Sequence, residues 1–321
     1  MINKQNCEKS WWSSMLEFFF ILKEIILPIF IVLIIGVVIQ TKFKLDLQTI
    51  AKLNIYVFIP AFIFVKLYET TISPLLFMTV ILYLLIFVFV LYITGFIMAR
   101  VLKLDPKKRV TFTNSVIFFN SGNFGVPVND LVFKSDPFAT SIQVIVLMFQ
   151  NIFLFSYGVF SLQSLDSGKL RALFAYFKMP VMYAMLLGVL FNWYEVNVSA
   201  LVMIPVTYLA DGMIALALLM LGMQVAEMKI SKGLGSVYAS LVIRLVAGPF
   251  IALCLIYLFG ISGMLAQALF IASAMPTSVN TAVIAQEYKN HPDYAAQIVL
   301  FSTVFSAITV SIIIYFARIL F

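Results

Sequence analysis

The sequence predicts an all-α protein that crosses a membrane many times. Of its 321 residues, 63% are hydrophobic and only 11% are charged, and a water-soluble fold of this length cannot bury so much apolar surface. The apolar residues form long continuous runs, and a helix needs only about 20 of them to cross a bilayer. An outer-membrane barrel would instead show short alternating segments. The predicted fold class is therefore a polytopic bundle of membrane helices.

Five spans are expected in the first half of the chain. Trp11 and Trp12 precede the first of them, as is typical of an anchor at the membrane interface. The charged stretch from Arg100 to Arg109 follows the third span and is expected to be a cytoplasmic anchor. These spans are predicted at residues 18–40, 47–67, 73–99, 110–131 and 137–163.

Five more spans are expected in the second half. The stretch from Leu245 to Gln286 contains 42 residues without a charge, which is too long for one span. The sequence FGISG, from Phe259 to Gly263, is the expected turn within it. The spans are predicted at residues 171–193, 200–224, 236–260, 264–287 and 293–318.

The distribution of lysine and arginine predicts the orientation. With the N-terminus outside, the inner side holds fourteen of these residues and the outer side six, while Arg244 falls within a span. Basic residues concentrate on cytoplasmic loops. We therefore expect a multi-pass protein of the cell membrane with both termini outside.

The two halves match at one offset. Pro28 in the first span and Pro180 in the sixth are 152 residues apart, and the fourth and ninth spans begin 154 residues apart. Residues 1–165 and 166–321 are accordingly predicted to be two repeats of five spans each. An odd number of spans per repeat forces opposite orientations, and inverted repeats of this kind are typical of secondary transporters.

Each repeat contains one span that its sequence interrupts. The fourth span contains FNSGNFGVPV, from Phe119 to Val128, and the ninth contains ASAMPTSVNTA, from Ala272 to Ala282. Both stretches lie near the middle of their spans, where irregular backbone must be buried in protein or line a wet cavity. Proline is favoured in the first turn of a helix, so we expect a half-helix to end and another to begin near each interruption.

The interruptions predict a binding site for something polar and anionic. The N-terminus of a half-helix presents free N–H groups and about half a positive charge, and glycine lets the backbone approach a ligand. The alternative is that small residues merely pack helix against helix, but matching interruptions in two spans favour a site. The candidate residues are Asn120, Ser121, Gly122, Asn123, Gly125, Pro127, Pro276, Thr277, Ser278 and Asn280.

Other polar residues within the spans admit two interpretations each. Arg244 is expected to extend its side chain to the lipid headgroups, with contact to a substrate or a carboxylate as the alternative. Asp211 is a candidate proton carrier or a protonated, hydrogen-bonded scaffold residue. Gln150 and Asn151 in the fifth span are expected to line a cavity, with a tie between helices as the alternative.

The motifs NSGNFGVPV (Asn120–Val128) and AMPTSVNTAV (Ala274–Val283) resemble those of the auxin efflux carrier family. That family includes the plant PIN carriers and bacterial permeases for malate and malonate, and the resemblance covers essentially the whole chain. In this family, asparagines and prolines lie where two broken helices cross. The resemblance places their counterparts here at Asn120, Asn123, Pro127, Pro276 and Asn280. The segment NIYVFIPAF resembles the family's scaffold segment that faces the substrate, which implies that Asn54 and Pro60 lie near the site.

The resemblance also implies an architecture and a mechanism. The fold would be akin to the bile-acid/sodium symporters, with the fourth and ninth spans crossing at their breaks. The first, second, sixth and seventh spans would form a scaffold domain, and the other six a transport domain that moves as an elevator. Homodimers would form through the scaffold. The small loops favour a bacterial-type permease over a plant hormone carrier.

The leading hypothesis is a secondary transporter of small organic anions, such as malate or a related mono- or dicarboxylate. A channel of the same fold and a ligand-binding membrane sensor are the alternatives. No enzymatic activity, cofactor or metal is expected, because the sequence offers no phosphate loop, metal cluster or nucleophile triad. The net charge of +7 follows from topology and does not suggest nucleic acid, and Cys7 and Cys254 are too far apart to imply a disulfide framework.

Overall fold

The computed structural model describes residues 16–69, 73–163, 180–228 and 234–321, and within them the chain is helical. The one β feature of this part is an isolated bridge between Phe119 and Thr277. Seven helical stretches of the described chain are long and apolar enough to cross a membrane. These stretches are Leu16–Phe43, Leu47–Glu69, Pro74–Val101, Pro137–Leu162, Ala200–Glu227, Gly235–Leu258 and Pro292–Leu320.

The seven stretches confirm seven of the predicted spans to within a few residues. The predicted fourth and ninth spans are each broken into two shorter helices. The sixth is described as Pro180–Trp193, and its predicted first residues, 171–179, lie outside the described residues. The expected turn after Leu258 is confirmed, because Gly260 and Gly263 both adopt a positive φ of 62°.

In the labels that follow, α denotes an α-helix and η a π-helical segment. The first half of the described chain contains η1 (Leu22–Ile26), α2 (Leu27–Phe43), α3 (Leu47–Leu53), η2 (Asn54–Phe58), α4 (Ile59–Glu69), α5 (Pro74–Val101), α6 (Pro106–Ile117), α7 (Gly125–Phe133), α8 (Pro137–Phe153), η3 (Leu154–Gly158) and α9 (Val159–Gln163). The second half contains α11 (Pro180–Trp193), α12 (Ala200–Glu227), α13 (Gly235–Val242), η4 (Ile243–Ala247), α14 (Gly248–Leu258), α15 (Gly263–Ser273), α16 (Val279–Glu287) and α17 (Pro292–Leu320).

Several helices begin at a polar residue followed directly by proline. Asp105 accepts a hydrogen bond from the N–H of Lys108, Asp136 accepts two from the turn after Pro137, and Ser73 accepts one from Leu76. These side chains satisfy N–H groups that a helix start leaves free, and proline suits the first helical position because it has no N–H.

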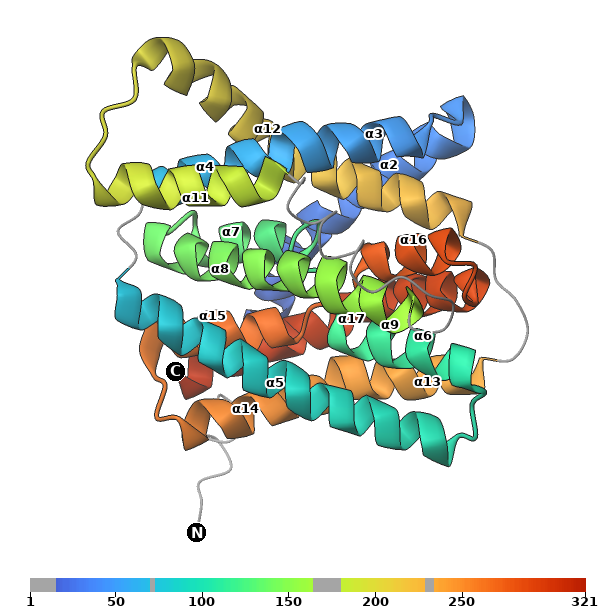
Figure 1. The fold of residues 1–321 in the computed structure, drawn as a ribbon. Coiled ribbons are helices and arrows are strands. Elements are labelled where there is room, and N and C mark those ends of the chain that lie inside the picture. The colour runs from blue at the N-terminus through green and yellow to red at the C-terminus, as the bar shows by residue number, and fades with distance from the viewer. Residues whose placement is uncertain (1–15, 70–72, 164–179, 229–233) are drawn as a thin grey trace.

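The helices form two packed groups (Figure 1). In the first group, α12 packs on α2 and α4, and α11 packs on α4. The second group contains α5 to α9 and α13 to α17, which supply most of the larger buried apolar core, while η1, α2 and α12 also contribute to it. A smaller apolar cluster joins the groups, because residues of α4 and α12 meet Val126 of α7 and Leu147 of α8. The broken helices therefore face the first group across this boundary.

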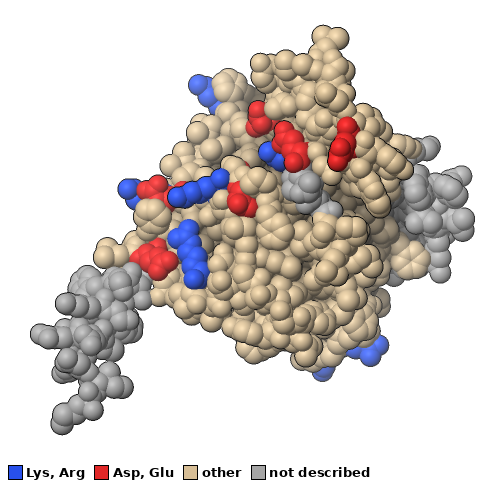
Figure 2. Space-filling model, turned by 90° about the vertical axis from the view of Figure 1, so that its left-hand side faces the viewer, with Lys and Arg blue, Asp and Glu red and all other residues tan. Residues whose placement is uncertain are grey.

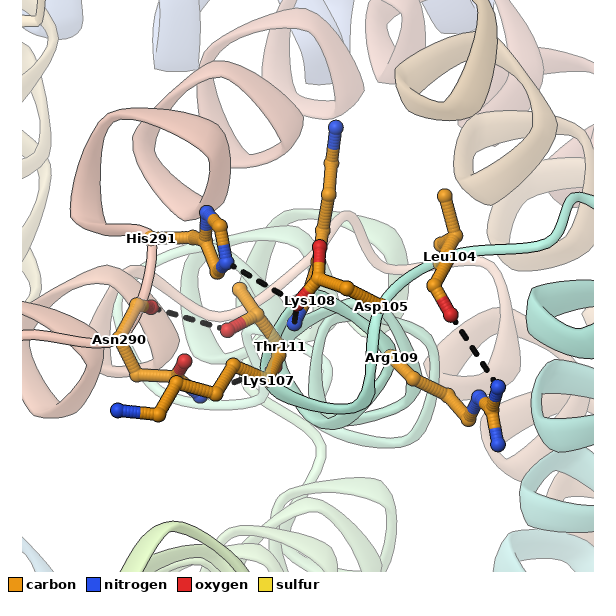
Figure 3. Close-up of polar contacts among 8 residues, drawn as sticks. All are labelled: Leu104, Asp105, Lys107, Lys108, Arg109, Thr111, Asn290 and His291. Atoms are coloured by element: carbon orange, nitrogen blue, oxygen red, sulfur yellow. Dashed lines mark hydrogen bonds and ion pairs between the residues drawn. The ribbon is translucent and has the colours of Figure 1, made fainter. Parts of the chain in front are cut away.

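A network of polar contacts joins the loops before α6 and α17 (Figure 3). His291 Nε2 lies 3.5 Å from Asp105 Oδ1, and Thr111 donates to the carbonyl of Asn290 at 3.0 Å. The side chain of Asn290 donates to the carbonyl of Lys107 at 3.1 Å. The bond from the Lys108 N–H, together with His291, holds the pKa of Asp105 below its usual range. The hydrogen bonds of Thr111 and Asn290, with the contact between His291 and Asp105, therefore tie the starts of the two helices together.

Much of the outer surface is apolar. Leu75, Leu201 and Leu258 are 78%, 84% and 75% exposed. Figure 2 shows a face on which charged side chains gather over one part while a wide area carries none. Such large apolar areas are rare on proteins that face water. This surface is suited to contact with lipid.

Two glycines bring α2 and α12 into backbone contact. A Cβ added to Gly222 would lie 1.9 Å from the carbonyl oxygen of Leu33, and one added to Gly36 would lie 2.3 Å from that of Leu219. Neither position has room for a side chain. Small residues allow membrane helices to pack this closely.

We predict that Gly222→Ala destabilises the folded protein by about 1–3 kcal/mol, because α2 must move away from α12. Gly235→Ala is the matched control, since nothing lies within 4 Å of a Cβ placed there. Thermal unfolding in detergent measures the effect. Equal melting temperatures for Gly222→Ala and the wild type would contradict the packing.

Candidate functional site

Both predicted interruptions are breaks in helical structure. The first separates α6 from α7 and comprises residues 118–124, and the second separates α15 from α16 and comprises residues 274–278. Pro127 lies in the first turn of α7, as predicted, whereas Pro276 lies three residues before α16. The two breaks are therefore similar in kind but differ in length.

The two breaks pair with each other. Phe119 and Thr277 form an antiparallel bridge. The N–H of Asn120 donates to the carbonyl of Pro276 at 2.8 Å, and the N–H of Ser278 donates to that of Phe118 at 2.9 Å. Unpaired backbone groups are costly at membrane depth. Each break therefore supplies hydrogen-bond partners for part of the other's backbone.

Side chains from three helices support the pairing. Thr277 donates its hydroxyl to the carbonyl of Ser115 in α6 at 2.9 Å, and its N–H donates to Ser302 Oγ in α17 at 3.1 Å. Gln143 of α8 donates to the carbonyl of Ser121 at 2.7 Å. These contacts fix both breaks against the rest of the second group.

Arg244 in η4 lies at the centre of this arrangement. Its guanidinium donates to the carbonyl of Val116, near the end of α6, at 3.1 Å, and to that of Ser273, the last residue of α15. It also lies over the ring of Phe119, with Cζ 5.0 Å from the ring centre. The side chain is 0% exposed. The prediction that Arg244 extends to the headgroups is therefore wrong, because both helix ends bind it inside the protein.

A cavity of about 70 Å³ lies beside the paired breaks. Residues of both helix groups surround it. Nine of the predicted residues line it, namely Asn54, Asn120, Ser121, Gly122, Asn123, Gln150, Asn151, Ser278 and Asn280. Gln224 lines it too, together with apolar residues that include Phe119, Leu147 and Met220.

The cavity lining is polar but uncharged. Seven of its residues carry amide side chains, and none of the lining residues is Asp, Glu, Lys or Arg. Several buried polar atoms here have no hydrogen-bond partner among the described residues: Asn54 Oδ1, Asn120 Nδ2, Gln224 Oε1 and both polar atoms of Gln150. Buried polar atoms in native proteins are nearly always satisfied. The cavity is thus equipped to bind a polar ligand or water.

Four predicted residues do not line the cavity. Gly125 faces Gln143 instead, whose Nε2 would lie 2.7 Å from an added Cβ. Thr277 is occupied by its bonds to Ser115 and Ser302, and Pro276 offers its carbonyl to Asn120. Pro127 is buried in the first turn of α7. These residues hold the breaks in shape, and the expectation that Gly125 lets the backbone approach a ligand is not met.

The first helix group contributes more to the cavity than the sequence suggested. Asn54 lies opposite the first break, with its Nδ2 3.5 Å from Asn123 Oδ1. Pro60 is buried in α4 next to Ile59, which lines the cavity while Pro60 does not. Gln224 was not predicted. Its signal in the sequence is an amide within the otherwise apolar run LMLGMQV of α12.

A second cavity, of about 240 Å³, is lined by residues of α7 and by other parts of α4, α8 and α12, which also line the first. Asp211 lines it, together with Lys66, Asn129 and Asp130. Gln143 borders this cavity and also donates to the carbonyl of Ser121, which lines the first one. Asp211 therefore lies apart from the paired breaks, and the Ser121–Gln143 contact lies between the two cavities.

Comparison with known proteins identifies the family. The model of the family described as "Membrane transport protein" matches residues 26–172 and 169–314. The chain belongs to this membrane transport protein family. A protein described as an "Uncharacterized transporter" from Methanothermobacter thermautotrophicus is 24% identical over 295 residues, which are 89% of this chain and 95% of that protein.

Two plant members of this family match a shorter stretch. They are "Auxin efflux carrier component 3a" of Oryza sativa subsp. japonica and "Auxin efflux carrier component 1" of Arabidopsis thaliana. Each is 29% identical over 129 residues, which are 38% of this chain and 21% of the plant protein. The resemblance seen in the sequence is thereby confirmed. The chain is a membrane transporter of the auxin efflux carrier type, and these relatives indicate a transporter rather than an enzyme.

Ser302 provides a test of how this transporter holds its second break. We predict that Ser302→Ala destabilises the fold by about 1–3 kcal/mol, because the buried N–H of Thr277 loses its acceptor. Ser306→Ala is the matched control, since Ser306 lies one turn further along α17, is also 0% exposed, and donates within its own helix to Thr303. Thermal unfolding should separate the two variants, and an equal loss in both would count against the predicted support.

Proposed function

We propose that this transporter carries small organic anions, with malate or a related mono- or dicarboxylate as the best candidate. The observation that carries the proposal is the cavity beside the paired breaks, with its seven amide side chains and unpartnered polar atoms. Amides offer N–H donors to a carboxylate without a fixed charge that would hold it too strongly. Carboxylate binding in such a site is therefore reversible.

The start of α16 strengthens the preference for an anion. Val279 and Asn280, its first two residues, line the cavity. The first N–H groups of a helix lack acceptors within the helix and carry the positive end of its dipole. The start of α7 contributes less directly, because the N–H groups of Gly125 and Val126 donate to the carbonyls of Asn120 and Gly122. A carboxylate would thus bind closest to α16.

Transport requires the cavity to change. Its volume of about 70 Å³ is below the roughly 300–1,000 Å³ of pockets that hold organic ligands. Asn54, Met220 and Gln224 of the first helix group line it opposite the breaks of the second. A shift between the two groups would widen the cavity and change the side from which it is reached. This is alternating access of the elevator type.

The elevator assigns roles to the two helix groups. The first, second, sixth and seventh spans would be a scaffold that forms the homodimer contact, and the others the moving transport domain. The repeats 1–165 and 166–321 would each supply one broken span. Mass measurement of the detergent-purified protein tests the dimer, and a purely monomeric mass would contradict it.

Counterflow in proteoliposomes is the experiment that tests the function. Vesicles are loaded with unlabelled malate, and a trace of labelled malate is added outside. Uptake of the label is then measured at several pH values and membrane potentials. A carrier gives saturable accumulation of label, whereas a channel of the same fold gives flux without counterflow. Malonate, lactate and indole acetate follow if malate gives no signal. Ligand binding without transport across this panel would point to a sensor instead.

We predict that Asn123→Ala and Asn280→Ala each reduce transport at least tenfold, because each removes an amide from the cavity. Asn197→Ala is the control, since Asn197 is exposed in the loop before α12. Initial counterflow rates measure the effect, with thermal unfolding to show that the variants fold. Normal transport by both variants would refute the site.

Asp211 is proposed as the residue that couples transport to protons. It lines the second cavity with Lys66 and Asp130, apart from the breaks. An acid in a membrane span can take up and release a proton as its surroundings change. We expect Asp211→Asn to flatten the pH dependence of counterflow. A pH profile identical to that of the wild type would exclude this role.

A further inference from the structure

Four half-helix ends meet where the breaks pair. The C-terminal ends of α6 and α15 point inward at Ile117 and Ser273, and the N-terminal ends of α7 and α16 begin at Gly125 and Val279. Each C-terminal end carries about half a negative charge and each N-terminal end about half a positive one. These four partial charges sum to about zero. The helix ends alone therefore give the crossing no net charge.

Arg244 changes this balance. Its guanidinium donates to the carbonyls of Val116 and Ser273, so it lies on the two negative ends. Within the described part of the chain, no carboxylate lies within ion-pair distance of Arg244, and its side chain is 0% exposed. Its full positive charge cancels the two negative half-charges at the C-terminal ends of α6 and α15. The positive ends of α7 and α16 then remain without compensation.

The charge of Arg244 also reaches the cavity. The guanidinium carbon lies 5.0 Å from the centre of the Phe119 ring, and Phe119 lines the cavity beside the breaks. Phe119 thus contacts the cation and also borders the cavity, which Arg244 itself does not line. Across a distance of about 10 Å in the protein interior, a unit charge still changes anion affinity by roughly tenfold. The attraction therefore acts without direct contact.

We infer that Arg244 determines the charge selectivity of this site by cancelling the negative ends of α6 and α15. The inference rests on the proposed function, in which an anion binds in the cavity, and adds the group that makes the site prefer one. Arg244 is a positioning and selectivity residue, because it touches the helix ends and not the ligand. The cavity needs no charged lining residue of its own.

A merely structural role for Arg244 predicts something different. If the guanidinium only fastened α6 to α15, its loss would weaken the binding of charged and neutral ligands alike. If its charge sets the selectivity, its loss should weaken the binding of anions alone. The ratio of the two affinities separates these roles, and it can be measured on whatever fraction of a variant is folded.

The experiment compares L-malate with its neutral diamide, malamide, as ligands of the full-length protein in nanodiscs. We expect Arg244→Gln to lower the malate-to-malamide affinity ratio about tenfold, and Arg244→Lys to keep most of it because the positive charge remains. Arg318 is exposed near the end of α17. Arg318→Gln removes the same positive charge there and should leave the ratio unchanged.

A second variant retains the arginine. Ser240 lies one helical turn before Arg244, is 0% exposed, and its hydroxyl has no partner. Ser240→Asp would place a carboxylate beside the guanidinium and neutralise it while the bonds to both helix ends persist. We expect the same fall in the ratio, whereas Ser240→Asn should have no such effect.

The outcomes distinguish this inference from the proposed function. An unchanged ratio in both Arg244→Gln and Ser240→Asp would overturn the role of Arg244 while leaving an anion site in place. A wild type that binds neither malate, malonate, lactate nor indole acetate would overturn the proposed function and this inference with it. A ratio that falls in both variants and in neither control supports the inference.

Discussion

The structure depends on one constraint, which is that non-helical backbone inside a membrane must find hydrogen-bond partners. The chain meets it by pairing two breaks that lie more than 150 residues apart in the sequence. The hydrogen bonds between Asn120 and Pro276 and between Ser278 and Phe118 give partners to backbone N–H and C=O groups in both breaks. Neither break could exist alone at this depth without an equivalent partner. The site therefore needs both halves of the chain at once.

This constraint divides the residues of the breaks into two kinds. Thr277, Gly125 and Pro276 bond or pack within the protein, and their loss would disturb the shape of the crossing. Asn123 and Asn280 turn toward the cavity. The same short motifs thus contain both the supporting residues and the binding groups, in neighbouring stretches. Because the support is fixed by α8 and α17, the side of the cavity that the breaks form is held in place.

Much of this could be predicted from the sequence, for physical reasons that differ between residues. Asparagine, glycine and proline within an apolar run disrupt a helix wherever they occur, so both breaks could be located. The bonding of Thr277 to Ser302 and the contact of Gly125 with Gln143 depend on helices distant in the sequence, and no local pattern reports them. Gln224 lies on a helix that is apolar around most of its circumference, so its direction could not be inferred. The position of Arg244 along its own helix predicts that its side chain reaches the headgroups. Its environment is instead set by the ends of two other helices, which that position does not reveal.

The position of Arg244 bears on how a carrier can be both selective and fast. A lysine or arginine within the cavity would attract a carboxylate strongly in a medium of low dielectric constant, and release would then be slow. A cation held outside the cavity, on two carbonyls that it already neutralises, attracts the same anion weakly. The amides then supply bonds that are lost without leaving a bare charge behind. Selectivity for charge and ease of release would thus be assigned to different groups. Arg244, α6 and α15 all belong to the second helix group, so in the proposed elevator mechanism the same balance would accompany the site as that group moves.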